Sequence, residues 1–161
     1  MNCSIARALD QVGEWWSLLI IRECTLGTTR FDEFQDRLGI ARNILTNRLK
    51  RLTELGILEK SALGENERRQ GYTLTPKGEE LFPVLMALLQ WGDKWAAGED
   101  GPSVRFVERD SGKPLGAAGP QSARGHTLGI RDVRMEPGPG ATDSTKARIN
   151  ARNLAVLGPG G

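Results

Sequence analysis

The sequence predicts an α+β fold that is mostly helical and contains one β-hairpin. Three observations lead to this prediction. Apolar residues recur at helical spacing in successive short segments up to residue 55. Two strand-like segments then flank the polar run GENERRQ, and a helix that starts with proline follows them. Helices followed by a hairpin with a polar tip match the winged helix-turn-helix plan, here with a small β-rich C-terminal extension.

The first two expected helices are recognised by their ends. Ser4 is suited to cap a helix that runs to Val12, and Gly13 would end it. Residues 14–26 (EWWSLLIIRECTL) form a mostly apolar second helix, which a glycine stops. Cys24 falls on this helix, so we expect its side chain to be buried.

The next two expected helices have helix-turn-helix spacing. The first, ended by Gly39, carries one apolar face. That face consists of Phe31, Phe34 and Leu38. The second helix spans residues 41–55, and its apolar seam consists of Leu45, Leu49 and Leu52. The short turn with glycine between the two helices is the connection that a helix-turn-helix requires.

A β-hairpin and a broken helix are expected next. ILEKSAL and GYTL supply the strands on either side of the polar turn. Thr75 can cap the following helix, with Pro76 at its first position. Pro83 lies inside the apolar continuation of that helix, so we expect a break near residues 80–82.

Composition divides the chain into three parts. Residues 1–97 form the winged helix-turn-helix domain, residues 98–140 a small β-rich extension, and residues 141–161 a flexible tail with a marginal helix near 144–156. The segment 98–161 holds 12 of the 20 glycines and 6 of the 8 prolines. Such a composition warns of low complexity.

Cysteine content and hydropathy indicate the cellular compartment in which the protein is expected. Two cysteines without a CxxC spacing indicate a reducing compartment. The longest apolar run, LLII at 18–21, is too short for a membrane span. The N-terminus has no signal-peptide pattern. We therefore expect a cytoplasmic protein that does not enter the membrane.

The segment 42–51 (RNILTNRLKR) concentrates four basic residues in a domain whose first 98 residues carry 13 basic and 13 acidic groups. On a helical wheel, the residues that point away from the leucine seam are Asn43, Asn47, Lys50 and Glu54, and Arg42, Thr46 and Arg51 flank them. Amide and basic groups can meet base edges or phosphates of DNA. A solvated basic face is the alternative interpretation. The hairpin tip adds Arg68 and Arg69, and nearby glutamates weaken its positive charge.

Several motifs in order resemble the HxlR-type transcriptional regulators, which are related to MarR-type repressors. They are CSIARAL, a Gly-x-Trp-x-x-Leu helix, RF at 30–31, NRL…L…LGIL and YTLTPKG, and the match covers residues 3–95. The resemblance implies a homodimer that binds an inverted repeat in double-stranded DNA. The expected DNA-contacting residues are Arg30, Arg42, Asn43, Thr46, Asn47, Lys50, Arg51, Arg68 and Arg69. Ala41 departs from the Ser or Thr that often caps the recognition helix.

An apolar stripe predicts where the dimer forms. It lies on a helix at 5–12 and a helical segment at 83–97, and it is too large for a domain already closed by helices and a hairpin. The expected interface residues are Leu9, Val12, Val84, Leu85, Leu88, Trp91 and Trp95.

Cys3 also matches a position of the resembled family, in which some members sense oxidants or electrophiles. A thiol at a helix N-terminus is stabilised as the reactive thiolate. The alternative role is packing at a dimer contact. Should Cys3 be unreactive, a small-molecule effector pocket could be lined by Trp15, Trp16 and Trp91.

Enzymatic and metal-dependent functions are not expected. The sequence has one histidine, no glycine-rich phosphate loop and no nucleophile–base pattern. The extension resembles a zinc ribbon, but Ser111 and Arg124 occupy knuckle positions where cysteines would bind the metal. We therefore predict no metal and no cofactor. A winged-helix module for protein or RNA contacts remains the alternative to a DNA-binding regulator.

Overall fold

The computed structural model describes residues 3–62, 70–96, 98, 101–102 and 104–157. The chain divides into two compact units, Met1–Ala96 and Ala97–Gly161, which are described separately. The expected three-part division of the chain stays a prediction. Within the described residues, no helix has the length and apolar character needed to cross a membrane.

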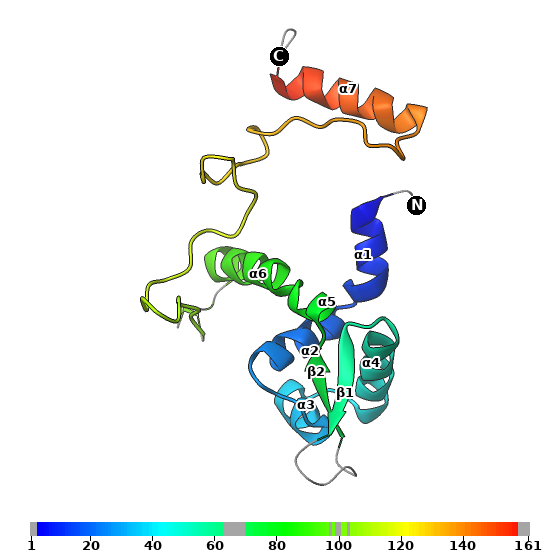
Figure 1. Cartoon of the computed structure of the whole chain (residues 1–161), viewed down its shortest axis with the longest axis vertical. Coiled ribbons are helices and arrows are strands. Elements are labelled where there is room, and N and C mark those ends of the chain that lie inside the picture. Colours follow the sequence, from blue (N-terminus) through cyan, green and yellow to red (C-terminus); the bar gives the residue numbers. More distant parts are fainter. Residues whose placement is uncertain (1–2, 63–69, 97, 99–100, 103, 158–161) are drawn as a thin grey trace. The chain divides into compact units, whose positions relative to one another are not determined.

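The first unit is a winged helix-turn-helix, as predicted (Figure 1). Its elements in chain order are α1 (Ser4–Val12), α2 (Trp15–Thr25), α3 (Phe31–Leu38), α4 (Arg42–Glu54), β1 (Leu58–Ala62), β2 (Gln70–Leu74), α5 (Pro76–Glu79) and α6 (Phe82–Trp95). The two strands pair antiparallel, with Leu58 opposite Leu74 and Ala62 opposite Gln70. The expected break at residues 80–82 separates α5 from α6.

The turn between α3 and α4 depends on Gly39. This residue has φ 61°, a left-handed conformation that glycine adopts without steric cost. Ala41 then serves as the N-cap of α4 and makes no side-chain hydrogen bond. Polar side chains at this position typically stabilise a helix by about 1 kcal/mol relative to alanine. The start of α4 is therefore held by packing rather than by a capping side chain.

The core holds α4 against α2, α3 and the hairpin. The predicted seam of α4 is fully buried, since Leu45, Leu49 and Leu52 are 0% exposed. Other fully buried side chains come from the neighbouring elements. They are Phe34, Ile20, Ile21, Ile57 and Leu58. This burial fixes which face of α4 points outward.

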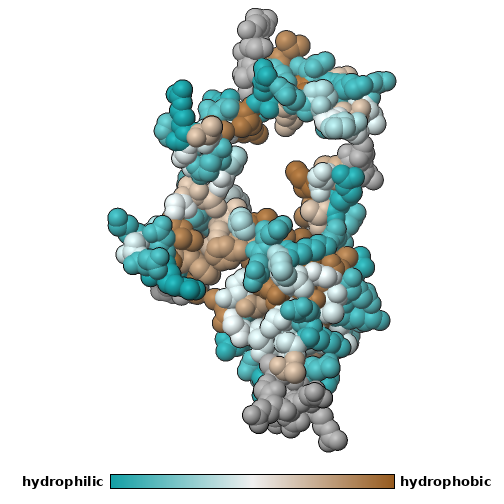
Figure 2. All heavy atoms as spheres, viewed as in Figure 1, coloured by the Kyte–Doolittle hydropathy of each residue, from teal (hydrophilic) through white to brown (hydrophobic). Residues whose placement is uncertain are grey.

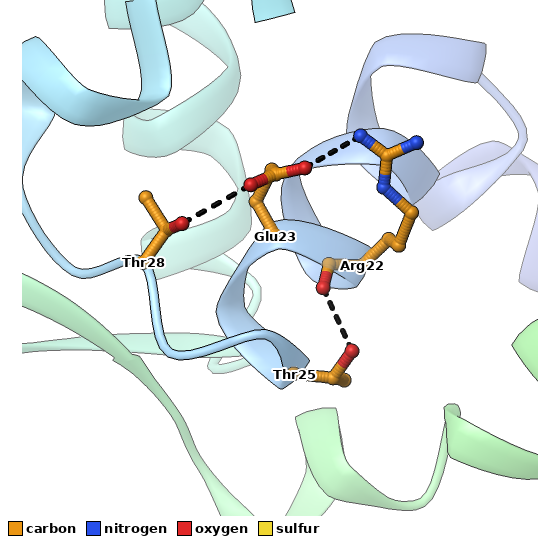
Figure 3. Close-up of polar contacts among 4 residues, drawn as sticks. All are labelled: Arg22, Glu23, Thr25 and Thr28. Atoms are coloured by element: carbon orange, nitrogen blue, oxygen red, sulfur yellow. Dashed lines mark hydrogen bonds and ion pairs between the residues drawn. The ribbon is translucent and has the colours of Figure 1, made fainter. Parts of the chain in front are cut away.

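A polar cluster closes the C-terminal end of α2 (Figure 3). Glu23 is 4% exposed, and its carboxylate accepts a hydrogen bond from the Thr28 hydroxyl at 3.1 Å. Arg22 pairs with the other carboxylate oxygen at 2.5 Å. The Thr25 hydroxyl donates to the Arg22 carbonyl at 2.7 Å. These contacts satisfy a buried charge and fix the path of the chain from α2 towards α3.

The sequence predicted capping residues for α5 and α1, and one of the two is found in that position. Thr75 caps α5 as predicted, since its hydroxyl accepts from the Gly78 N–H at 3.2 Å. Gly78 packs so closely that a Cβ there would collide with the Ile57 carbonyl oxygen. The predicted cap of α1 is wrong by one residue. Cys3 occupies the N-cap position in extended conformation, and Ser4 is already the first helical residue.

The second unit is less regular than the β-rich extension that we expected. Among its described residues it has two isolated bridges, Val107 with Pro114 and Gln121 with Thr127, and no strand longer than a bridge. Proline lacks an N–H group and cannot extend a ladder, which is consistent with such short pairings.

A long helix, α7 (Asp143–Leu157), ends the described part of the second unit. Its span is close to the marginal helix expected at 144–156, although the surrounding segment was expected to be a flexible tail. The Asn153 amide donates to the Met135 carbonyl at 2.7 Å, and its oxygen accepts from the Met135 N–H at 3.1 Å. The Arg152 guanidinium donates to the carbonyls of Val133 and Ile130. These contacts hold the segment 130–135 along α7.

Candidate nucleic-acid interface

The outward face of α4 carries the polar residues that the sequence singled out. Four of them line a shallow surface depression: Arg42, Asn43, Thr46 and Asn47. Lys50 and Arg51 are exposed in the following turn. Because the leucine seam is buried on the opposite side, these six side chains share the solvent-facing part of one helix.

The two asparagines are the groups best suited to read bases. Asn43 and Asn47 are exposed, and neither side-chain amide has a hydrogen-bond partner among the described residues. They lie four residues apart and therefore on the same side of α4. An asparagine amide can donate to and accept from one adenine edge in the major groove at the same time.

Intramolecular contacts restrain the two residues beside these asparagines. The Arg42 guanidinium stacks over the Phe31 ring of α3, with 5.0 Å between its central carbon and the ring centroid. This cation–π contact orients the guanidinium while leaving the side chain exposed. The Thr46 hydroxyl donates to the Arg42 carbonyl at 2.8 Å, so its proton is used within the helix.

The basic residues of α4 differ in how far their charge is balanced. Lys50 Nζ lies 3.8 Å from a Glu54 carboxylate oxygen, in an exposed pair that contributes little to stability. Arg51 has no ion-pair partner in the described part of the chain. Arg48, by contrast, lies 3.1 Å from Glu14 and is directed toward α2. Helical spacing indicates on which side of α4 Arg48 lies. It does not show that Glu14 is the partner.

The structure places Arg30 in a local ion pair. Its Nε and one terminal nitrogen donate to the two Asp32 carboxylate oxygens at 3.1 and 2.9 Å. The hydrogen bond and the positive charge of Arg30 lower the pKa of Asp32 below its ordinary value. The same partner raises the pKa of Arg30. The positive charge of Arg30 is therefore largely balanced by Asp32. Arg68 and Arg69 lie outside the described residues.

Exposed apolar side chains gather on α1 and α6. Figure 2 shows hydrophobic surface over α6. Five expected interface residues are 47–67% exposed: Leu9, Val84, Leu88, Trp91 and Trp95. The other two, Val12 and Leu85, are each 8% exposed, because they pack into the core of their own domain. Val12 and Leu85 are therefore not part of the exposed apolar surface. Ile5 on α1 and Trp15 on α2 are further exposed apolar residues, 72% and 60% exposed, outside the predicted stripe.

The two cysteines lie in opposite environments. Cys3 is exposed at the start of α1, and the backbone N–H groups of Ala6 and Ile5 lower its pKa below the ordinary value. Cys24 is largely buried, and desolvation together with the Glu23 charge raises its pKa to about 12. The thiolate is the reactive form of cysteine. Cys3 is thus the more reactive thiol of the pair.

A surface cleft of about 590 Å³ lies beside Cys24. It is bounded by the end of α2, by β2 and by the start of α6. Its lining residues are Cys24, Thr25, Thr28, Thr29, Tyr72, Thr73, Leu74, Glu79 and Phe82. None of the tryptophans expected to line an effector pocket contributes to it. Trp15 and Trp16 instead stack on each other, with 4.0 Å between their ring centroids.

Comparison with known proteins connects this fold to regulators. The family model described as HxlR-like helix-turn-helix matches residues 11–100. An uncharacterised HTH-type transcriptional regulator of Mycobacterium tuberculosis is 36% identical over 137 residues, which cover 85% of this chain and 87% of the relative. The crystal structure of PA1607, proposed to be a transcription factor, matches with a TM-score of 0.77 and 42% identity, over 85% of this chain and 96% of that one.

A redox regulator is also similar in fold. HypR in its oxidised form matches with a TM-score of 0.54 and 26% identity, over 60% of this chain and all of the HypR chain. Together with the winged fold and the exposed polar helix, these similarities define a transcriptional regulator of helix-turn-helix type. The chain belongs to the HxlR-like helix-turn-helix family.

Proposed function

We propose that this chain is a sequence-specific DNA-binding regulator that acts as a homodimer on an inverted-repeat operator. The observation that carries the proposal is the outward face of α4. There Asn43 and Asn47 present exposed amides, without a hydrogen-bond partner in the described part of the chain, beside exposed basic groups. In a helix-turn-helix the second helix enters the major groove and its N-terminal residues contact bases. Asn43 and Asn47 would therefore read sequence, while Lys50 and Arg51 would contact phosphates.

The exposed apolar residues of α1 and α6 support the homodimer. Contiguous apolar surface of this kind usually marks an interaction site. Leu88, Trp91 and Trp95 lie at successive helical turns of α6 and are all at least half exposed. A second copy of the chain would cover them and set the spacing between two α4 helices.

Sensing through Cys3 is the regulatory part of the proposal. The exposed thiol with its lowered pKa precedes α1, which carries exposed Leu9. An electrophile or oxidant that modified Cys3 would add bulk beside the proposed dimer contact. HypR, which shares the fold, is named a redox regulator, and this similarity favours the same kind of role here.

DNase footprinting of the purified protein on DNA upstream of its own gene tests operator binding. We expect a protected inverted repeat, with half-sites separated by about one helical turn, ~34 Å. Light scattering at micromolar concentration should give the mass of a dimer, and a monomer mass would contradict the proposed assembly. Binding to duplex DNA that weakens steeply with salt separates this function from a protein- or RNA-binding module. Protection of no duplex sequence would remove the operator from the proposal.

A further inference from the structure

Glu14 connects the start of α2 to the middle of α4. Its Oε2 accepts a hydrogen bond from the Trp16 N–H at 3.2 Å, which caps α2. The same oxygen lies 3.1 Å from Arg48 Nε on α4. That Nε atom is shielded from solvent and makes no aligned hydrogen bond. The Glu14 charge therefore balances a part of the guanidinium that water does not reach.

Lys77 makes a second connection, at the C-terminal end of α4. Its Nζ donates to the Gln11 side-chain oxygen on α1 at 3.0 Å and to the Leu55 carbonyl at 2.8 Å. Leu55 is the C-cap of α4. The last carbonyls of a helix lack partners within the helix and carry partial negative charge, so an ammonium group stabilises them. Lys77 thus bridges the end of α1 and the end of α4.

Both connections start from one short segment of chain. Gln11 lies in the last turn of α1, Glu14 is the N-cap of α2, and only Val12 and Gly13 separate them in the chain. The Gly13 N–H donates to the Leu9 carbonyl at 2.7 Å, so this junction continues the hydrogen bonding of α1. A helix that is contacted at one point can rotate about that point. Contacts in the middle of the helix and at its end together fix the direction of its axis. The junction holds α4 at two such points.

We propose that Arg48 and Lys77 are positioning residues that couple the direction of α4 to the end of α1. The regulatory meaning of this coupling rests on the proposed function. Cys3 lies at the other end of the same helix, and a displacement of α1 would move Gln11 and Glu14 together. Two half-site contacts must match the repeat of the DNA helix, so a small rotation of α4 in each subunit would lower operator affinity.

The test destabilises α1 and measures the change in the α4 amide chemical shifts. It does so in proteins with and without the connections made by Glu14 and Lys77. Ala6→Gly/Ala8→Gly weakens α1, because glycine is a poor helix former. Glu14→Gln/Lys77→Met removes the connections. Asp10→Asn/Lys60→Met is the matched control, since it removes the same charges from exposed positions of α1 and β1. Amide chemical shifts of residues 42–54 are measured in the full-length protein, with and without the α1 substitutions, in each background.

We expect the α1 substitutions to shift the α4 resonances in the wild-type and control backgrounds. In the variant without connections, the mean shift change should fall below half of the wild-type value. Lys77→Met alone should suppress the response only in the last turn of α4, and this milder variant serves if the double substitution does not fold. An equal response in all backgrounds, or no response in the wild type, would overturn the inference.

Operator affinity is measured separately on the same proteins. We expect the α1 substitutions to weaken operator binding at least fivefold in the wild-type background and less than twofold in the variant without connections. Equal weakening in the two backgrounds would also contradict the inference. If no variant, including the unmodified protein, binds duplex DNA, the proposed function fails, while the chemical shifts still decide whether α1 and α4 are coupled.

Discussion

The carboxylate of Asp32 holds the guanidinium of Arg30 through two hydrogen bonds, 3.1 and 2.9 Å long. Both residues belong to the start of α3, where Arg30 is the N-cap and Asp32 lies in the first turn. Arg30 was expected to contact DNA, and the pair sets a limit on that contact. A phosphate can gain from the Arg30 charge only by competing with Asp32.

Asp32→Asn should strengthen binding to DNA of any sequence, because it releases the Arg30 charge. If one more phosphate is then neutralised, the slope of log K against log salt should steepen by about 0.9. Asp36→Asn, at an exposed position of the same helix, is the control for a general change in net charge. Equal salt slopes for the two variants would show that Arg30 does not reach a phosphate.

Asn47→Ala should cost ~1–3 kcal/mol of binding on the cognate operator and little on random DNA, since it removes a base contact. Lys50→Ala and Arg51→Ala should weaken binding on both kinds of DNA and reduce the salt slope by about 0.9 each. Fluorescence anisotropy with both duplexes at several salt concentrations measures these effects. Equal losses on the two duplexes for Asn47→Ala would contradict its assignment as a base-reading residue.

Alkylation of Cys3 should reach its half-maximal rate at a lower pH than alkylation of a free cysteine. The reason is that its lowered pKa increases the thiolate fraction at any pH below that pKa. Mass spectrometry after iodoacetamide treatment at several pH values gives the rates. Cys24 lines the surface cleft but has a pKa of about 12, so it should react much more slowly than Cys3. A gel shift with diamide or methylglyoxal, with Cys3→Ser as control, then decides whether modification releases the operator.

Gly78→Ala should destabilise the first unit, because the new Cβ would collide with the Ile57 carbonyl and lie 2.9 Å from Leu74 Cδ2. Overpacking of this kind typically costs ~1–3 kcal/mol. The comparison is Gly98→Ala, beyond the end of α6, where a Cβ meets nothing within 4 Å. Alanine there should be nearly neutral, because it meets no neighbouring atom and Gly98 has no positive φ. Thermal unfolding of both variants measures the difference, and equal melting temperatures would exclude the steric conflict.

Much of the first unit follows from local signals in the sequence. Gly39 marks the turn after α3 and Thr75 marks the start of α5, because each residue type favours that local structure. The leucine seam of α4 follows from helical spacing. The burial of Val12 and Leu85 does not follow in this way. Periodicity identifies an apolar face, but which part of it is covered depends on neighbouring elements.

The ion pairs of the candidate interface show the same limit. Arg30 and Asp32 are close in sequence, yet their pairing depends on side-chain rotamers. Arg48 and Glu14 are far apart in sequence and meet only because α2 packs near α4. The residue types on the outward face of α4 could be predicted, whereas the division between free and balanced charges needed the folded structure.

The contrast between Cys3 and Cys24 also gives the unmodified chain a built-in site for a spectroscopic probe. A maleimide spin label or fluorophore added near neutral pH should attach to Cys3 far faster than to Cys24, because Cys24 is less exposed and has a raised pKa. In a symmetric dimer each subunit would then carry one probe at the start of α1. Because the label itself modifies Cys3, the distance between the two probes would report the arrangement of the subunits in the modified state, without a single engineered cysteine.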